Sequence, residues 1–329
     1  MVRFAVTLAA VLAGCGQVPS GTASFVFGAT SPRPDVPMAA DPETTVAEGT
    51  LAVQGLTEAK RRTWKDIPYG RHPQQRLDVY GVMDGRTQRP VVVYVHGGAW
   101  YLGDKGHKMA DKPRFFNDLG YVFVSVNYRL ADPGLPEAQR PMHPCQAQDI
   151  ARAVAWVTRN ISGYGGRPTG LGLLGHSAGA HLAALVSSNP RFLSAHGLGL
   201  DVIRGVVAND TASYDLTKPD SPLLASFIRN AFGTSSEVLQ DASPLRQLQS
   251  GRSTPAFLIL VQGSESRVAA ARTFHHATVQ TDRRMPGDEF LRVSRPGYGH
   301  EQMNDAVGRS GERVVSPAIQ TFFRKQLGR

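Results

Sequence analysis

The chain has 329 residues, of which 41% are hydrophobic, and its formal net charge is +9. That length suits one large domain with short additions or two small domains, and the apolar content excludes a disordered chain. The Lys and Arg residues are scattered without any nucleic-acid motif, so we expect no nucleic-acid partner, and two cysteines are too few for a disulfide framework.

The N-terminus has the layout of an export signal. Arg3 precedes an apolar run over residues 4–13, which is too short to span a bilayer. The run ends in Leu12-Ala13-Gly14-Cys15, which resembles the lipobox of bacterial lipoproteins, in which the cysteine is lipidated. The resemblance implies a signal peptide over 1–14 and lipidation of Cys15. The protein would then be an exported lipoprotein, anchored on the periplasmic or cell-surface side of a bacterial membrane. The alternative is an ordinary signal that is cleaved later, which would give a soluble exported protein.

Residues 15–62 are predicted to form a flexible tether. Their first part, through about Thr50, is rich in Gly, Ser, Thr, Pro and Ala and has little hydrophobic periodicity. Such a composition favours an extended, mobile linker over a packed core. The tether would connect the lipid anchor to a folded domain that begins at residue 63.

Short apolar runs alternate with helical patterns over residues 63–329. The run 91–95 is continuously apolar and largely β-branched, as expected of a strand that is buried on both faces. The alternation predicts an α/β fold with a mostly parallel sheet and helices on both faces. A longer stretch, 211–254, lies between two strands and could form a small cap over the site. The expected strands are 75–80, 91–95, 121–126, 171–174, 202–208, 256–261 and 290–293, and the expected helices include 146–160 and 178–186.

A glycine-rich motif follows the strand 91–95, and it reads His96-Gly97-Gly98-Ala99-Trp100. A glycine pair lets backbone N–H groups turn toward a ligand. Such donors can stabilise the oxyanion of an acyl-transfer reaction, by about 3 kcal/mol each. We therefore predict an oxyanion hole made by the N–H groups of Gly97, Gly98 and Ala178, with His96 bracing the loop. The alternative is a plain glycine turn.

The candidate nucleophile is Ser177, in the segment Gly175-His176-Ser177-Ala178-Gly179. This segment matches the G-x-S-x-G nucleophile elbow. The serine of an elbow lies on a tight strand-to-helix turn, so its neighbours must be small. The context agrees, because a strand pattern precedes the segment and a helix pattern of small residues follows it.

Together with Asn127-Tyr128-Arg129, Gln148-Asp149 and Trp156, these motifs resemble the HGG-containing esterases of the α/β-hydrolase fold. That group includes feruloyl-esterase-like, hormone-sensitive-lipase-like and arylformamidase-like branches, and the resemblance covers about residue 64 to the end. It implies hydrolysis of small-molecule carboxylic esters, with Arg129 and Asp149 in structural roles. An arylformamidase-like amidase is one alternative, and a lipoprotein that kept the fold for binding without catalysis is another. We expect no cofactor, and no spacing of ligand residues suggests a metal site.

The candidate general base is His300. In this fold the triad follows the chain order serine, acid, histidine. His300 ends the segment Pro296-Gly297-Tyr298-Gly299-His300, soon after the last predicted strand, where the resemblance also places the catalytic histidine. His275 and His276 lie in a helical stretch and are expected to be surface or packing residues.

The sequence leaves the triad acid open. The resemblance places an aspartate three residues after the glycine that ends the seventh strand, but here Gly263 is followed at that distance by Ser266. Asp210, after the strand 202–208, is the leading candidate, because some α/β-hydrolases carry the acid there. Glu265 is the alternative, one position before the usual slot. Each also has a simpler interpretation, Asp210 as a turn or helix cap and Glu265 as a solvated charge.

Overall fold

The computed structural model describes residues 60–248, 254–281 and 288–328. The predicted signal peptide, the lipidation residue Cys15 and most of the predicted tether lie outside these residues. In the described part of the chain, no helix has the length and apolar character needed to cross a bilayer.

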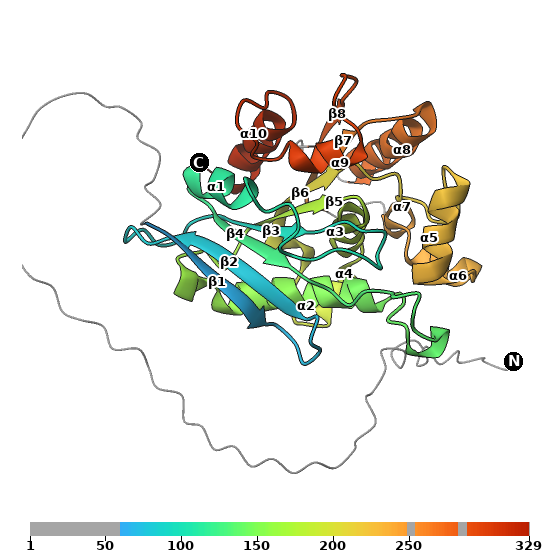
Figure 1. Ribbon diagram of the computed structural model, residues 1–329, viewed down its shortest axis with the longest axis horizontal. Coiled ribbons are helices and arrows are strands. Elements are labelled where there is room, and N and C mark those ends of the chain that lie inside the picture. Colours follow the sequence, from blue (N-terminus) through green and yellow to red (C-terminus); the bar gives the residue numbers. More distant parts are fainter. Residues whose placement is uncertain (1–59, 249–253, 282–287, 329) are drawn as a thin grey trace, which may run out of the picture.

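One sheet of eight strands forms the centre of the described structure (Figure 1). Its strand order is β1-β2-β4-β3-β5-β6-β7-β8. Strand β1 pairs antiparallel with β2, and β2 pairs antiparallel with β4, whereas all other neighbours are parallel. The strands are β1 (Arg61–Pro68), β2 (Arg76–Val82), β3 (Val91–Val95), β4 (Val122–Val126), β5 (Leu171–His176), β6 (Ile203–Asn209), β7 (Ala256–Val261) and β8 (Glu289–Arg292). The prediction of a mostly parallel sheet is confirmed.

Helices cover both faces of the sheet because its strands are apolar on both faces. In β3, Val91, Val93 and Val95 belong to one core cluster, and Val92 and Tyr94 belong to the other. This division follows from the alternation of side chains along a strand. The first cluster includes apolar residues of α2, α3 and α8, and the second includes those of α1 and α10. These helices are α1 (Lys112–Asp118), α2 (Cys145–Asn160), α3 (Ala178–Ser188), α8 (Glu265–Thr281) and α10 (Val315–Leu327).

The remaining α-helices lie in the connections. They are α4 (Pro190–Ser194), α5 (Pro222–Phe232), α6 (Ser236–Asp241), α7 (Pro244–Gln247) and α9 (His300–Asp305), with short 3₁₀ turns at 137–139, 161–164 and 200–202. The helices α5, α6 and α7 occupy the stretch 211–254, at one end of the sheet (Figure 1). Ser221 and Ser235 are the N-cap residues of α5 and α6, and their side chains accept hydrogen bonds from backbone N–H groups of the first turn.

The stretch 211–254 contacts the glycine-rich loop through aromatic rings. The ring of Phe227 lies 5.9 Å from that of Tyr101, and the ring of Phe232 lies 5.0 Å from that of Trp100. The same stretch contacts α3, where the imidazole of His181 donates from Nε2 to the carbonyl of Ala242 over 2.8 Å. The candidate cap is therefore packed against the loop that carries the predicted oxyanion donors.

Candidate active site at the carboxyl ends of the strands

Ser177 lies on a sharp turn between β5 and α3. Its backbone has φ 55° and ψ −120°, a conformation that non-glycine residues rarely adopt. Strain of this kind costs about 1–3 kcal/mol and persists only where neighbours enforce it. Here the N–H of Ser177 donates to the carbonyl of Asn209 over 3.0 Å, which ties the turn to the end of β6.

The two glycines of the elbow are required by close approach of the backbone. A Cβ at Gly175 would lie 2.3 Å from the carbonyl oxygen of Gly179, and a Cβ at Gly179 would lie 2.1 Å from that of Val95. A side chain at Gly175 would therefore push β5 away from α3, and a side chain at Gly179 would push α3 away from β3. The G-x-S-x-G spacing thus follows from packing.

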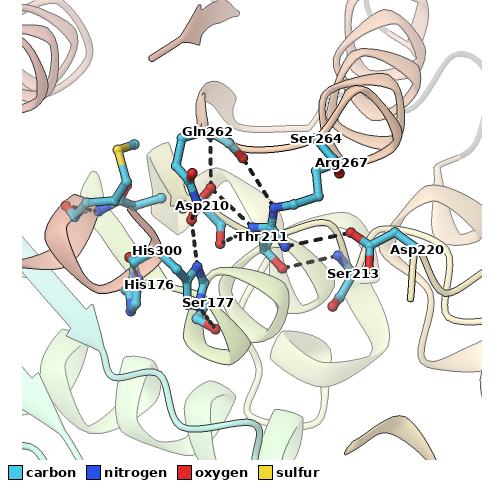
Figure 2. Close-up of polar contacts among 12 residues, drawn as sticks. His176, Ser177, Asp210, Thr211, Ser213, Asp220, Gln262, Ser264, Arg267 and His300 are labelled. Carbon is cyan, nitrogen blue, oxygen red and sulfur yellow. Dashed lines mark hydrogen bonds and ion pairs between the residues drawn. The ribbon is translucent and has the colours of Figure 1, made fainter. Parts of the chain in front are cut away.

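The structure brings Ser177, His300 and Asp210 together (Figure 2). His300 is the first residue of α9, and its Nε2 lies 2.9 Å from Ser177 Oγ. Its Nδ1 lies 2.6 Å from Asp210 Oδ2. When Nδ1–H donates to the carboxylate, Nε2 presents a lone pair to the serine hydroxyl, as a general base requires.

Asp210 follows β6 and is fully buried. Its Oδ1 accepts a hydrogen bond from the backbone N–H of Gln262, and its Oδ2 accepts one from Gln262 Nε2, at 3.0 and 2.9 Å. Burial opposes ionisation of this carboxyl. However, the hydrogen bond from His300 and the nearby Arg267 outweigh burial and lower the pKa of Asp210 to about 2. Asp210 is therefore a carboxylate near pH 7.

Glu265 lies elsewhere. It begins α8, its side chain is 80% exposed, and it forms an ion pair of 2.6 Å with Arg292. Ser266, in the slot where the resemblance places an aspartate, contacts the hydroxyl of Ser264 over 2.9 Å. Of the two candidate acids, the structure thus places Asp210, and not Glu265, against His300.

The glycine-rich loop passes directly beside the nucleophile. A Cβ at Gly97 would lie 3.1 Å from the Cβ of Ser177. Gly98 has φ 114°, and a Cβ there would lie 2.2 Å from the carbonyl oxygen of Leu102. Outside the helices and strands of the described residues, no backbone hydrogen bond uses the N–H groups of Gly97, Gly98 or Ala178.

His96 braces this loop. Its Nδ1 donates to the carbonyl of Gly97 over 2.7 Å, and its ring stacks on Tyr128 at 4.4 Å. Burial lowers the pKa of His96 to about 4, so the ring is neutral near pH 7. Beside the loop lies a cavity of about 430 Å³. It is lined by residues of the loop, of α9 and of the end of β5, including Gly97, Gly98, Leu102, His176, Glu301 and Asn304.

Two residues next to the triad hold its members in place. His176 donates from Nε2 to the carbonyl of His300 over 2.9 Å, and burial lowers its own pKa to about 4. Asn209 accepts from the N–H of Ser177, as described above, and its Nδ2 donates to the carbonyl of Met303 in α9 over 2.9 Å. Asn209 therefore contacts both the nucleophile turn and the helix that carries His300.

The sequence reasoning missed Asn209, Gln262 and Arg267. Asn209 and Gln262 are polar residues at the carboxyl ends of two buried neighbouring strands, which is a signal that could have been used. Arg267 gives no such signal, because it lies inside a helix. Arg129 and Asp149 form an ion pair with Nη2–Oδ1 and Nε–Oδ2 distances of 2.7 and 2.8 Å, which agrees with the structural roles that the resemblance implies.

A mostly parallel sheet, with a serine elbow after β5 and a histidine after β8, defines the α/β-hydrolase fold. Among the described residues, no group of three or more His, Cys, Asp and Glu side chains is arranged to hold a metal ion. The BD-FAE family model matches residues 77–195 of the chain.

Comparisons with individual proteins agree with this class. The chain is 32% identical to Esterase LipQ of Mycobacterium tuberculosis, over 80% of this chain and 62% of that protein. It is 29% identical to Kynurenine formamidase of Salmo salar, over 61% of this chain and 60% of that protein. The chain thus spans about three fifths of the length of these relatives. The hyperthermophilic esterase of Pyrobaculum calidifontis has the same fold, with a TM-score of 0.60 and 22% identity over 81% of this chain and 86% of that one. These similarities support a carboxylesterase family.

Proposed function

We propose that this protein hydrolyses small-molecule carboxylic esters through an acyl-enzyme on Ser177. The observation that carries the proposal is the continuous set of contacts from Ser177 Oγ to His300 Nε2, at 2.9 Å, and from His300 Nδ1 to Asp210 Oδ2, at 2.6 Å. Nucleophile, base and orienting acid lie in the order that serine hydrolysis needs. No cofactor takes part in the proposed reaction.

The proposed reaction has two halves. Ser177 Oγ attacks the carbonyl carbon of the ester while its proton passes to His300 Nε2, and Asp210 stabilises the imidazolium that forms. The carbonyl oxygen becomes an oxyanion, which the N–H groups of Gly97, Gly98 and Ala178 can bind, with about 3 kcal/mol from each donor. When the C–O bond of the ester breaks, the leaving alcohol takes the proton from His300. A water molecule, activated by the same histidine, then releases the acid.

Purified protein tests the proposal with a panel of short-chain acyl esters and a fluorophosphonate probe. We expect ester turnover and covalent labelling of the wild type, with neither in Ser177→Ala. Turnover should fall by up to about a millionfold, because the remaining oxyanion donors supply only part of the rate. A folded wild type that is neither labelled nor active would favour the alternative of a binding protein. Near-normal turnover of Ser177→Ala would refute the serine mechanism.

A second candidate function is amide hydrolysis of the arylformamidase kind. The similarity to Kynurenine formamidase favours it, and the same nucleophile and base would serve. An N-formyl aryl amide and the matched formyl aryl ester separate the two functions on one protein sample. We expect a higher kcat/KM for the ester. A higher value for the amide would make the formamidase the better description.

We further propose that the mature chain is a lipoprotein anchored through Cys15. The support is the sequence Leu12-Ala13-Gly14-Cys15 after a short apolar run. Metabolic labelling with a fatty acid, followed by membrane fractionation, tests the proposal. The wild type should carry label and sediment with membranes, and Cys15→Ser should do neither. Label on the variant, or a wild type that is wholly soluble and unlabelled, would contradict it.

A further inference from the structure

The carboxylate of Asp210 is contacted from two sides (Figure 2). His300 Nδ1 lies 2.6 Å from Oδ2, and Arg267 Nη2 lies 3.2 Å from Oδ1. The same Nη2 donates to the backbone carbonyl of Asp210 over 3.2 Å, and Arg267 Nε donates to the carbonyl of Gln262 over 3.2 Å. These three contacts hold Arg267 against the segment of Asp210 and Gln262, and one of them is an ion pair with the acid that orients the base.

We propose that Arg267 is a positioning residue of the active site, which holds the carboxylate oxygen of Asp210 that does not face His300, partly neutralises that carboxylate, and so weakens its attraction for a protonated His300. The inference rests on the proposed function, since it concerns the protonation of the base in that reaction. Arg267 itself touches no reacting atom.

The placement of the acid explains why the segment after β7 carries such a residue. That segment lacks the aspartate that the resemblance places there, and it provides Gln262 and Arg267 as donors to Asp210. Asp210 is fully buried and the side chain of Arg267 is 22% exposed, so bulk water screens their interaction only in part. A cation this close weakens the field with which the carboxylate stabilises an imidazolium on its other side.

The other charged groups around the triad come from several elements. On α9, Glu301 is ionised and forms an ion pair with Lys108. On β5, His176 is neutral near pH 7. Tyr214 also faces Asp210 and Arg267, and burial raises its pKa far above its usual range, so it stays neutral.

Asp220 completes the set, because its Oδ2 lies 3.7 Å from Arg267 Nη1, on the far side from Asp210. Asp220 therefore opposes the effect of Arg267 on His300. One substitution can therefore remove the positive charge of Arg267, and another can remove the negative charge of Asp220. Their effects on the protonation of His300 are expected to have opposite signs.

The experiment records the pH dependence of kcat/KM for ester hydrolysis, and of the rate of fluorophosphonate labelling. The wild type is compared with Arg267→Met, Arg267→Lys and Asp220→Asn. The control is Arg292→Met, which removes an arginine from the same region that pairs with the exposed Glu265. A unit charge about 7 Å away, at an effective dielectric constant of about 40 to 80, moves a titration midpoint by about 0.4 to 0.9 pH unit.

We expect the acid limb of Arg267→Met to move to higher pH by about that amount, because loss of the cation stabilises the imidazolium. Asp220→Asn should move it to lower pH by less, and Arg267→Lys and Arg292→Met should leave it nearly in place. If Arg267 and Asp220 had purely structural roles, Arg267→Met and Asp220→Asn would lower activity without moving the acid limb in opposite directions. If Arg267→Met and Asp220→Asn are active and keep the wild-type midpoint, or if both shift it in the same direction, the inference is wrong.

Two further readouts keep this test separate from that of the proposed function. The imidazole of His300 can be titrated by NMR, and the same opposite shifts are expected there even if the wild type hydrolyses no ester. If Arg267→Met does not fold, Asp220→Asn and Arg267→Gln carry the test. An unchanged His300 titration in these folded variants overturns the inference.

Discussion

Replacing Asp210 with asparagine is the most informative single substitution at this site. Asparagine has nearly the same size, but one carboxylate oxygen becomes an NH₂ group. Oδ1 of Asp210 faces the N–H of Gln262 and the guanidinium of Arg267, which are both donors. The amide oxygen therefore takes that side, and the NH₂ group turns toward His300. Nδ1 must then accept a hydrogen bond, Nε2 carries the proton, and the imidazole cannot take a proton from Ser177.

The expected magnitude follows from this tautomer change. The corresponding amide substitution in a serine protease triad lowers turnover about ten-thousandfold. A loss of that size corresponds to about 5.5 kcal/mol of transition-state stabilisation. The buried, multiply hydrogen-bonded position of Asp210 supports a similar loss here, because water cannot enter to replace the missing charge.

The assay is kcat on a short-chain ester, with protein folding checked by thermal unfolding. Glu265→Gln is the matched control, because it makes the same chemical change at the other candidate acid, whose side chain is exposed. We expect it to alter kcat by less than about twofold, as for a surface charge. A crippled Glu265→Gln beside a normal Asp210→Asn would refute this reasoning. Two normal variants would show that His300 works without either carboxylate.

Two further predictions concern stability. Gly179→Ala places a Cβ 2.1 Å from the carbonyl that ends β3, so urea denaturation should show a loss of about 3 kcal/mol or more, whereas Gly163→Ala, where a Cβ meets nothing within 4 Å, should change little; equal losses would contradict the packing argument. Burial lowers the pKa of three histidines to between about 3 and 4, against about 6.5 in the unfolded chain, so the unfolded chain binds more protons as the pH falls below 6.5. The free energy of unfolding should then fall by up to about 4 kcal/mol per pH unit, with the full contribution retained above pH 6.5, and a flat profile from pH 7 to 4.5 would refute the assignment. The histidines are His96, His176 and His181.

The fold could be predicted because its signals are local. The buried strands β3 and β7 are continuous apolar runs, and β4 and β5 are mostly apolar. The boundaries of these four strands differ from the predicted ones by at most two residues. Strand β1 was not predicted, and its first residue is Arg61. It is an edge strand with no fully buried position, so its sequence lacks the apolar alternation that marks a half-buried strand.

Some residues of the site could likewise be predicted from local sequence, and others could not. Ser177 and the glycine-rich loop follow from motifs whose steric needs are visible in a few adjacent residues. The acid does not, because chain order admits both candidates, and the choice depends on where two neighbouring strands end. Asp210 adopts φ 58° at the end of β6 and turns inward, whereas Glu265 begins α8 and turns outward. Arg267 could not be found from sequence, because its contact with Asp210 arises only when α8 packs against the sheet.

Asn209 links the three segments that carry Ser177, Asp210 and His300. Its carbonyl holds the turn of Ser177, its side chain holds the helix of His300, and its neighbour in the chain is Asp210. The three groups are thus joined through one residue at the end of β6, and separating the turn of Ser177 from α9 requires breaking a hydrogen bond of Asn209. Regions tied in this way open only in the global transition, whereas weakly held segments open earlier. On heating, loss of the reactive geometry and loss of tertiary structure are therefore expected as a single cooperative event.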